Sequence, residues 1–388
     1  MSNFNFLQIG IIVGAIIFVS VAVLILTGIL PGLRTDSNEA ANLTFWGFHD
    51  EEVYREIFGK YKEDHSKVSI KYEKKNPETL GRDFIDALAS GNAPDIVLMP
   101  SDLFFKEFGK FSSAPADILT ENYLTKNYIP AASIYIDSQK NIAGMPFYAD
   151  ALVLYFNNDL FARKFITVPP KTWDEFLEAA QKITEKDETG RITISGAAMG
   201  RSVNIKNSSL ILTTLLLQSG DKIISNNGIA TLGSSIRSGN VDVRPAESSL
   251  RFFSDFANPQ KTTESWSSAL PEAKELFIGG KLGMYIGLIS DYQEIRRKNA
   301  HLSFGVSPLP QLKGSARPIN GGILYGLVVP KLSKSQMQAW SLIAFLTNPE
   351  ISALFAERIS NVSIVRSALT SYQKDSIKSV LDKITNNK

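Results

Sequence analysis

The distribution of apolar residues divides the chain into an uncharged N-terminal segment and a long region of alternating strand and helix patterns. Residues 7–30 contain no charged side chain and are almost all apolar. A helix of that length spans the roughly 30 Å of hydrocarbon in a membrane. No basic start precedes the segment and no Ala-x-Ala site follows it closely, so we expect an uncleaved transmembrane anchor, with a cleaved signal peptide as the alternative.

A short polar linker, residues 31–42, follows the anchor. After it, strand and helix patterns alternate, which predicts an α/β fold with a parallel sheet and helices on both faces. The expected strands are residues 43–46, 68–72, 95–99, 152–156, 194–199, 282–286, 304–307 and 321–330. The expected helices are residues 51–64, 80–89, 101–108, 208–218, 246–256, 272–278, 335–346, 351–358 and 371–384.

Residues 144–179 give the clearest local predictions. The run from Leu152 to Phe156 is apolar throughout, which predicts a strand buried on both faces. Farther along, Thr172 is a favourable N-cap residue, and Glu175 three positions later completes a capping box. We therefore expect a helix to begin directly after Thr172.

The composition limits what the folded region can do. Its 388 residues are enough for two domains, and a formal charge of +2 without a long basic block argues against nucleic-acid binding. The absence of cysteine excludes disulfides, thiolate metal sites and a cysteine nucleophile. It also excludes a lipid-modified N-terminal cysteine. The three histidines are too scattered to indicate a metal site.

Sequence signatures of enzymes are absent as well. The chain has no Gly-x-Ser-x-Gly elbow, Walker loop, His-Glu-x-x-His motif or dinucleotide fingerprint. We therefore assign no catalytic residue, metal or cofactor, and expect a binding protein rather than an enzyme. Paired carboxylates could still serve a glycosidase, so a membrane-anchored polysaccharide hydrolase remains the alternative.

Several segments, in the same order, resemble a known family. The strand that begins Gly144-Met-Pro-Phe-Tyr-Ala-Asp-Ala-Leu and the helix start Pro169-Pro-Lys-Thr-Trp-Asp-Glu-Phe are similar to segments of the extracellular solute-binding proteins of ABC importers, the family of maltose-binding protein. Further similar segments lie at Leu43-Thr-Phe-Trp-Gly, Ala93-Pro-Asp-Ile-Val, Leu276-Phe-Ile-Gly-Gly-Lys-Leu-Gly-Met, Phe304-Gly-Val-Ser-Pro and Gln338-Ala-Trp-Ser-Leu. The resemblance extends over residues 43–369.

The resemblance implies an α/β, two-lobed periplasmic-binding-protein type II (Venus flytrap) fold, to which the transmembrane helix is added. Because strands cross between the lobes in that family, each lobe is discontinuous in sequence, and residues 304–307 are expected to be the returning hinge strand. The N-terminal lobe would comprise residues 43–147 and 308–347. The C-terminal lobe would comprise residues 148–307 and 348–388.

The resemblance also implies a function. The soluble domain would lie outside the cell membrane, capture a small solute such as a sugar or oligosaccharide between its lobes, and deliver it to the permease subunits of an ABC transporter. A sensor that uses the same fold is a further alternative. The sequence does not identify the ligand, because cleft side chains vary freely on one scaffold.

Two carboxylates match ligand-contacting acids of the maltose-binding branch. Asp102 follows an apolar strand, where it could equally be a first-turn charge favoured by the helix dipole. Asp150 lies where the chain crosses between lobes, and the alternative for it is a hinge-stabilising role. Tyr148 beside it is included as a binding residue. Asp50 also falls at a strand-to-helix turn, where we expect a helix N-cap that is partly exposed to the cleft.

Two aromatic residues complete the predicted binding set. Trp266 lies in a polar loop and could stack on a sugar ring, with packing under its own loop as the alternative. Tyr292 follows the strand 282–286, where the family places an aromatic ligand contact. The chain departs from the maltose branch at Asn207-Ser-Ser, where that branch has acidic and aromatic residues, so the same oligosaccharide is not implied.

Overall fold

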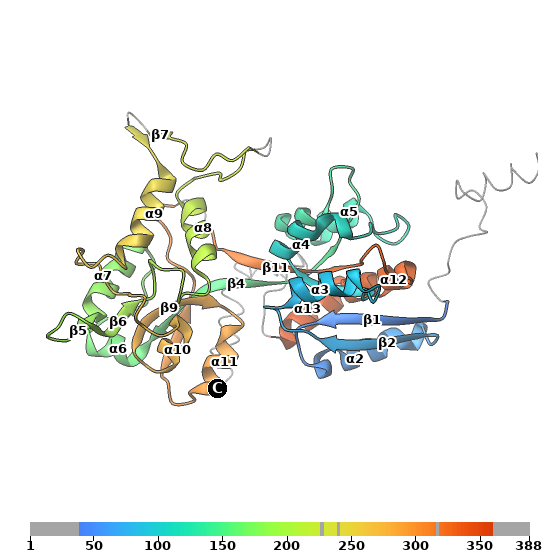
Figure 1. The fold of residues 1–388 in the computed structure, drawn as a ribbon, viewed down its shortest axis with the longest axis horizontal. Coiled ribbons are helices and arrows are strands. Elements are labelled where there is room, and N and C mark those ends of the chain that lie inside the picture. The colour runs from blue at the N-terminus through green and yellow to red at the C-terminus, as the bar shows by residue number, and fades with distance from the viewer. Residues whose placement is uncertain (1–38, 226–228, 239–240, 316–317, 360–388) are drawn as a thin grey trace, which may run out of the picture.

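Two lobes joined by a narrow connection make up the protein (Figure 1). The computed structural model describes residues 39–225, 229–238, 241–315 and 318–359. Each lobe has its own core of buried apolar side chains, so the lobes are separate packing units. One mixed sheet runs through both lobes in the strand order β2-β1-β3-β11-β4-β9-β6-β5. The predicted two-lobed α/β architecture is therefore present.

The first lobe is built on parallel strands, as the alternation of patterns predicted. Strand β1 lies between β2 and β3, and its residue Phe45 pairs with Tyr72 on one side and Ile96 on the other. The elements of this lobe, apart from the crossing strands, are β1 (Ala41–Gly47), α2 (Glu51–Asp64), β2 (Val68–Lys74), α3 (Leu80–Ala89), β3 (Ile96–Pro100), α4 (Ser101–Glu107), η1 (Phe108–Lys110), α5 (Glu121–Asn127), η2 (Pro130–Tyr135), α12 (Gln336–Leu346) and α13 (Pro349–Arg358).

The second lobe places β9 between β4 and β6. Helix α7 begins at Trp173, and the predicted capping box is confirmed, because the Thr172 side chain accepts from the backbone of Glu175 and the Glu175 side chain reaches back to the cap. The elements of this lobe are α6 (Asn158–Arg163), α7 (Trp173–Ile183), β5 (Glu185–Lys186), β6 (Ile192–Ala197), α8 (Ser208–Gln218), β7 (Ile236–Ser238), β8 (Val241–Val243), α9 (Pro245–Asp255), α10 (Ala273–Ile278), β9 (Leu282–Leu288), α11 (Asp291–Lys298) and β10 (Phe304–Ser307).

Two antiparallel strands, β4 (Met145–Asn157) and β11 (Gly322–Val328), connect the lobes. The first part of β4, through Tyr148, packs in the core of the first lobe, and the part from Ala151 onward packs in the core of the second. The pairing of β4 with β11 shifts register between Tyr325 and Gly326. A shift of this kind bends a strand pair locally, and here it lies opposite Phe147, on the first-lobe side of the crossing.

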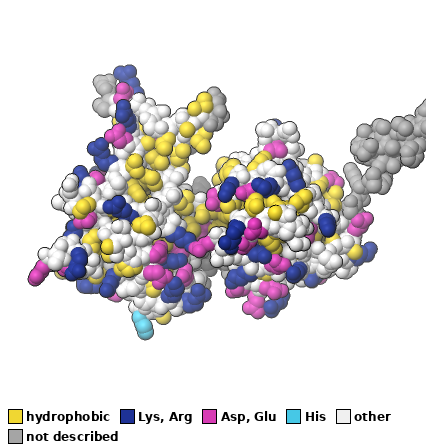
Figure 2. Space-filling view, in the orientation of Figure 1, with side chains coloured by type: hydrophobic (Ala, Val, Ile, Leu, Met, Phe, Trp, Pro, Cys, Tyr) yellow, Lys and Arg dark blue, Asp and Glu magenta, His cyan; other side chains and the backbone are white. Residues whose placement is uncertain are grey.

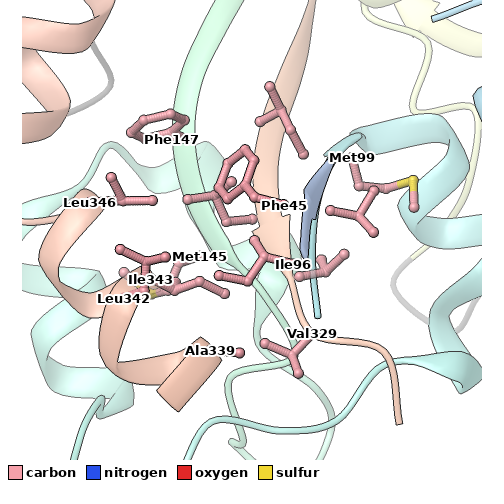
Figure 3. Close-up of a cluster of buried hydrophobic side chains, with 14 of the residues drawn as sticks. Phe45, Ile96, Met99, Met145, Phe147, Val329, Ala339, Leu342, Ile343 and Leu346 are labelled. Atoms are coloured by element: carbon pink, nitrogen blue, oxygen red, sulfur yellow. The ribbon is translucent and has the colours of Figure 1, made fainter. Parts of the chain in front are cut away.

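Helix α12 packs beside the strands of the first lobe (Figure 3). Its residues Leu342 and Ile343 are completely buried beside Met145 of β4. Full burial of an aliphatic side chain stabilises a fold by about 1.5–3 kcal/mol. This packing, between residues nearly 200 positions apart in the chain, holds the discontinuous lobe together.

Two boundary predictions are wrong. Residues 349–358 form α13, whose Phe355 is buried in the core of the first lobe and stacks on Phe147, with ring centroids 4.2 Å apart. They therefore do not belong to the C-terminal lobe. Residues 304–307 form β10, which pairs with the part of β4 inside the second lobe. The strand that returns beside the crossing part of β4 is β11 instead.

Within the described residues, none of the helices has the length and apolar content that a membrane span requires. The predicted anchor, residues 7–30, lies outside the described residues, as do most of the linker and the helix expected over residues 371–384.

Candidate ligand-binding site

A groove separates the lobes on the side of α4 and α8, above the crossing strands (Figure 2). Strand β4 runs across this connection with Tyr148 and Asp150 two positions apart, so both side chains lie on the same face of the strand. Both residues are among those predicted from the sequence to bind ligand. Tyr148 is 2% exposed and packs in the core of the first lobe, whereas Asp150 is 3% exposed and lies where β4 passes into the second lobe.

Aromatic rings from two segments of the first lobe, β11 and the residues that follow β1, cluster with Tyr148. Tyr325 of β11 pairs with Tyr148 across the sheet and stacks on it, with centroids 4.7 Å apart and the planes at 14°. Phe48, directly after β1, meets the edge of Tyr325 at 5.8 Å. His49 meets Tyr148 at 5.5 Å. Because Phe48 and Tyr325 are only partly buried, this cluster presents an apolar surface.

The Asp150 carboxyl is held from the second lobe. The backbone N–H of Ser290 donates to Asp150 Oδ1 at 3.2 Å. Burial raises the pKa of Asp150 to about 7, and the nearby negative charge of Asp291 adds to that effect against the hydrogen bonds from Ser290. The group is therefore near the midpoint between acid and carboxylate at neutral pH, and it can donate or accept a hydrogen bond.

A network of hydrogen bonds fixes the Leu288–Asp291 turn beside Asp150. Tyr155 Oη donates to the Leu288 carbonyl at 2.7 Å. Asp291 accepts from Tyr285 Oη at 2.8 Å and from the Leu288 N–H at 3.1 Å, and it forms an ion pair with Lys274 at 3.2 Å. These partners orient the turn and leave the Ser290 side chain exposed at the end of β9.

His49 is held as a neutral ring. Burial, followed by the positive charge of Lys74, lowers the pKa of His49 to about 4. Its Nδ1 lies 3.3 Å from Tyr54 Oη. At neutral pH the ring therefore adds an uncharged polar edge to the aromatic cluster.

The other two predicted acids lie on the first lobe and are exposed. Asp50 stands at the N-cap position of α2, but its side chain makes no capping hydrogen bond and pairs with Lys74 at 2.6 Å. Asp102 lies in the first turn of α4. Burial raises the pKa of Tyr325 above its usual range, and the negative charges of Asp150 and Asp102 add to this effect.

The prediction for Trp266 is wrong. Its ring is fully buried in the core of the second lobe, and its Nε1 donates to Asn204 Oδ1 at 2.9 Å. The ring belongs to that core and not to the crossing strands where the lobes meet. The polar residues of the loop around Trp266 form hydrogen bonds inside the lobe and so do not mark it as exposed. Ser265 Oγ, for example, donates to the Ala197 carbonyl. Tyr292 is half-buried and packs on Phe304 at 5.5 Å.

Three residues that the fold brings to this place, Phe48, Ser290 and Tyr325, were not predicted from the sequence. Phe48 lies two residues before Asp50, and Ser290 lies two residues before Tyr292. Both follow the end of a strand, where ligands bind in open α/β sheets, so their position could have indicated them. Tyr325 gave no such signal, because it lies inside an apolar strand and becomes a neighbour of Tyr148 only through antiparallel pairing. No cluster of His, Asp and Glu suited to a metal ion occurs among the described residues.

The arrangement of two lobes around crossing strands has a counterpart in known sequences. The profile of the bacterial extracellular solute-binding protein family matches residues 48–353. The chain belongs to this family. Its members are extracellular binding proteins, so the resemblance seen in the sequence is confirmed.

Individual relatives are distant. A binding protein of Brucella abortus is 25% identical over 215 residues, and the alignment covers 55% of this chain and 48% of that protein. The chain thus spans about half the length of this relative. The maltodextrin-binding protein of Bacillus subtilis is 24% identical, covering 78% of this chain and 70% of its own. The sn-glycerol-3-phosphate-binding periplasmic protein of Rhizobium meliloti is 24% identical, with coverages of 84% and 76%.

Solved structures support the fold. A solute-binding protein of an ABC transporter from Thermotoga lettingae, bound with α-D-tagatose, superposes with a TM-score of 0.66. It is 20% identical, and the match covers 89% of this chain and 86% of that one. At this identity the likeness establishes the two-lobed fold and leaves the ligand open.

Proposed function

We propose that this protein captures a small polyhydroxylated solute, a sugar or oligosaccharide, between its lobes and delivers it to the permease of an ABC transporter. The observation that supports this most directly is that Asp150, bonded to Ser290 of the second lobe, lies two residues along β4 from the Tyr148–Tyr325 stack. A sugar ring presents an apolar face for aromatic contact and hydroxyls for a carboxyl group. Relatives named for maltodextrin and tagatose binding favour the same class.

The ligand would contact both lobes. From the first lobe we propose Asp50, Asp102, Phe48, Tyr148 and Tyr325. Asp150 lies on the crossing strand, and Ser290 and Tyr292 would approach from the second lobe. Because a solute contacts both sides only when the lobes close, binding shifts the population toward the closed form.

We propose further that residues 7–30 anchor the protein in the cell membrane, with the described lobes on the outer side. The apolar length of this segment supports the proposal. The chain starting at residue 36 should then be soluble and folded without detergent. If it is unfolded while the full chain in detergent is folded, the segment belongs to the fold instead.

A thermal-shift screen tests the proposed ligand class. A ligand that binds only the native state raises the melting temperature. We expect a shift with a maltodextrin or a monosaccharide such as tagatose and none with peptides. If sn-glycerol 3-phosphate alone raises the melting temperature, the ligand class would be glycerol phosphates, as in the name of the Rhizobium relative, and not sugars.

Small-angle scattering and product analysis test the binding mode. With the best ligand at saturation, the radius of gyration should fall. Steady formation of product from a glycan would overturn the binding-protein assignment in favour of the hydrolase. A test with the permease distinguishes an importer component from a sensor. If the protein serves an importer, its liganded form should stimulate ATP hydrolysis by the transporter.

A further inference from the structure

An ion pair bridges the two lobes. Lys206, in the loop before α8 of the second lobe, lies with its Nζ 2.6 Å from Oε1 of Glu78, in the loop before α3 of the first lobe. The two residues are 128 positions apart in the chain. Among the ion pairs of the described residues, this one alone joins the two lobes. All others lie within one lobe.

Two acids of the first lobe are influenced by cations of the second. Lys206 lowers the pKa of Glu78, and the charge of Lys274 in the second lobe adds to the effect. Lys74 lowers the pKa of Asp50, and Arg297 of the second lobe contributes in the same direction. Of these second-lobe cations, Lys206 lies in ion-pair contact with its acid, so its attraction acts directly between the lobes.

The pair is positioned to respond to lobe motion. Both residues sit in loops outside the two cores, and the lobes are connected through β4 and β11. A hinge rotation at these strands carries Lys206 and Glu78 with different rigid bodies. A rotation that moves these two loops apart breaks the 2.6 Å contact and leaves each core intact.

We propose that Lys206 and Glu78 form an electrostatic latch that holds the lobes in the bridged arrangement and releases them when salt screens the pair. The latch adds little to the stability of either lobe, because its side chains are 60% and 67% exposed. Exposed pairs of this kind change an equilibrium constant by about two- to fivefold. That is enough to alter the ratio of two lobe arrangements that differ little in free energy.

The inter-lobe distance can be measured in the full chain in detergent without any ligand. The chain contains no cysteine, so Lys126→Cys in α5 and Ser254→Cys in α9 provide two unique, exposed dye positions on opposite lobes. Single-molecule energy transfer then reports the ratio of bridged to parted molecules. Raising NaCl from about 0.01 M to 1 M shortens the screening length from about 30 Å to 3 Å. We expect the bridged fraction to fall over this range.

Substitutions test whether the Lys206–Glu78 pair causes the salt dependence of the bridged fraction. At low salt, Lys206→Ala or Glu78→Ala should lower the bridged-to-parted ratio by about two- to fivefold and remove most of the salt response. Lys206→Glu should lower it further through repulsion, and the exchange of charges in Lys206→Glu with Glu78→Lys should restore it. Because no ligand is present, this outcome does not depend on the proposed solute.

A matched control is available within one lobe. Arg55 and Glu52 of α2 lie 3.2 Å apart, with side chains 68% and 77% exposed, and both belong to the first lobe. Arg55→Ala should leave most of the salt response in place. A Lys206→Ala protein whose distance distribution and salt response equal those of the wild type overturns the latch, as does a wild type that does not respond to salt.

Discussion

The two lobes contribute different chemistry to the place where they meet. The first lobe presents aromatic rings, with Phe48, Tyr148 and Tyr325 packed on one another. The second presents hydrogen-bonding groups, namely the Ser290 side chain and the turn fixed by Asp291. Apolar contact is non-directional, whereas hydrogen bonds depend on geometry. One lobe is therefore suited to attract a solute and the other to orient it.

The lobes also differ in how they hold these groups in place. Packing holds the aromatic rings, whereas buried hydrogen bonds from Tyr155 and Tyr285 fix the polar turn. A packed cluster tolerates changes of similar shape, but a buried polar network loses its geometry when one partner is removed. This difference predicts unequal responses to mutation on the two sides.

The largest effect should come from the core that supports the polar lobe. Trp266→Ala removes a fully buried indole and leaves Asn204 Oδ1 without its donor. We expect a loss of roughly 3–5 kcal/mol in the free energy of unfolding, measured by denaturant titration. Ligand affinity of the folded fraction should remain close to wild type. A large loss of affinity with unchanged stability would instead return Trp266 to the binding site.

Asp150 should give a pH-dependent change in stability. Burial raises its pKa to about 7 from an ordinary 3.8, so the folded state retains a proton that the unfolded chain has lost. Between about pH 4 and pH 7 this group therefore costs stability as pH rises, up to roughly 4 kcal/mol above pH 7. Asp150→Asn should gain stability over wild type at pH 8 and gain almost none at pH 4.

His49 provides the opposite sign as a comparison. Its pKa is lowered to about 4 by burial and by Lys74, so protonation favours the unfolded chain and stability is lost as pH falls from about 6.5 to 4. Between about pH 6.5 and 4, the melting temperature of His49→Phe should therefore fall less with decreasing pH than that of the wild type. Outside this range the two should depend on pH in the same way. If Asp150→Asn changes stability equally at pH 4 and pH 8, its effect comes from packing rather than from charge.

Ligand affinity should depend strongly on the same carboxyl group. Asp150→Ala removes the oxygens proposed to bind solute hydroxyls, and lost hydrogen bonds to a charged group cost about 1.5–3 kcal/mol, or about 10- to 150-fold in affinity. Titration calorimetry with the best ligand from the screen measures this. If a folded Asp150→Ala protein binds ligand normally, the role of Asp150 is structural: it connects β4 with the Ser290 turn and does not contact the solute.

The smallest effect should come from the aromatic side. Tyr325→Leu keeps an apolar side chain but removes the ring that stacks on Tyr148. Aromatic contacts contribute about 0.5–1.5 kcal/mol beyond their area, so affinity should fall by about two- to tenfold. Tyr123→Leu, in α5 of the same lobe and paired with Tyr128, is the matched control and should bind normally. Equal affinities in the two variants would remove Tyr325 from the site.

Much of the secondary structure could be predicted because it depends on local patterns. Helices α2, α3 and α8 have the predicted bounds, and the capping box of α7 is present. Local patterns were weaker for α11, whose sequence Asp-Tyr-Gln-Glu-Ile-Arg-Arg-Lys buries only Ile295 and so lacks an apolar stripe. Helix α13 was recognised as a helix but assigned to the wrong lobe, because its sequence does not specify which core Phe355 enters.

The sequence by itself determined the alternation of strands and helices, the two-lobed class and the position of Asp150 at a crossing strand, since these depend on periodicity, capping and an ordered set of family segments. The tertiary structure decided which side chains meet. Strand pairing placed Tyr325 on Tyr148, and core packing enclosed Trp266 in a loop that looks polar in sequence. Contacts between residues more than 100 positions apart, such as Lys206 with Glu78, depend on how complete lobes pack and turn, and local sequence contains no such information.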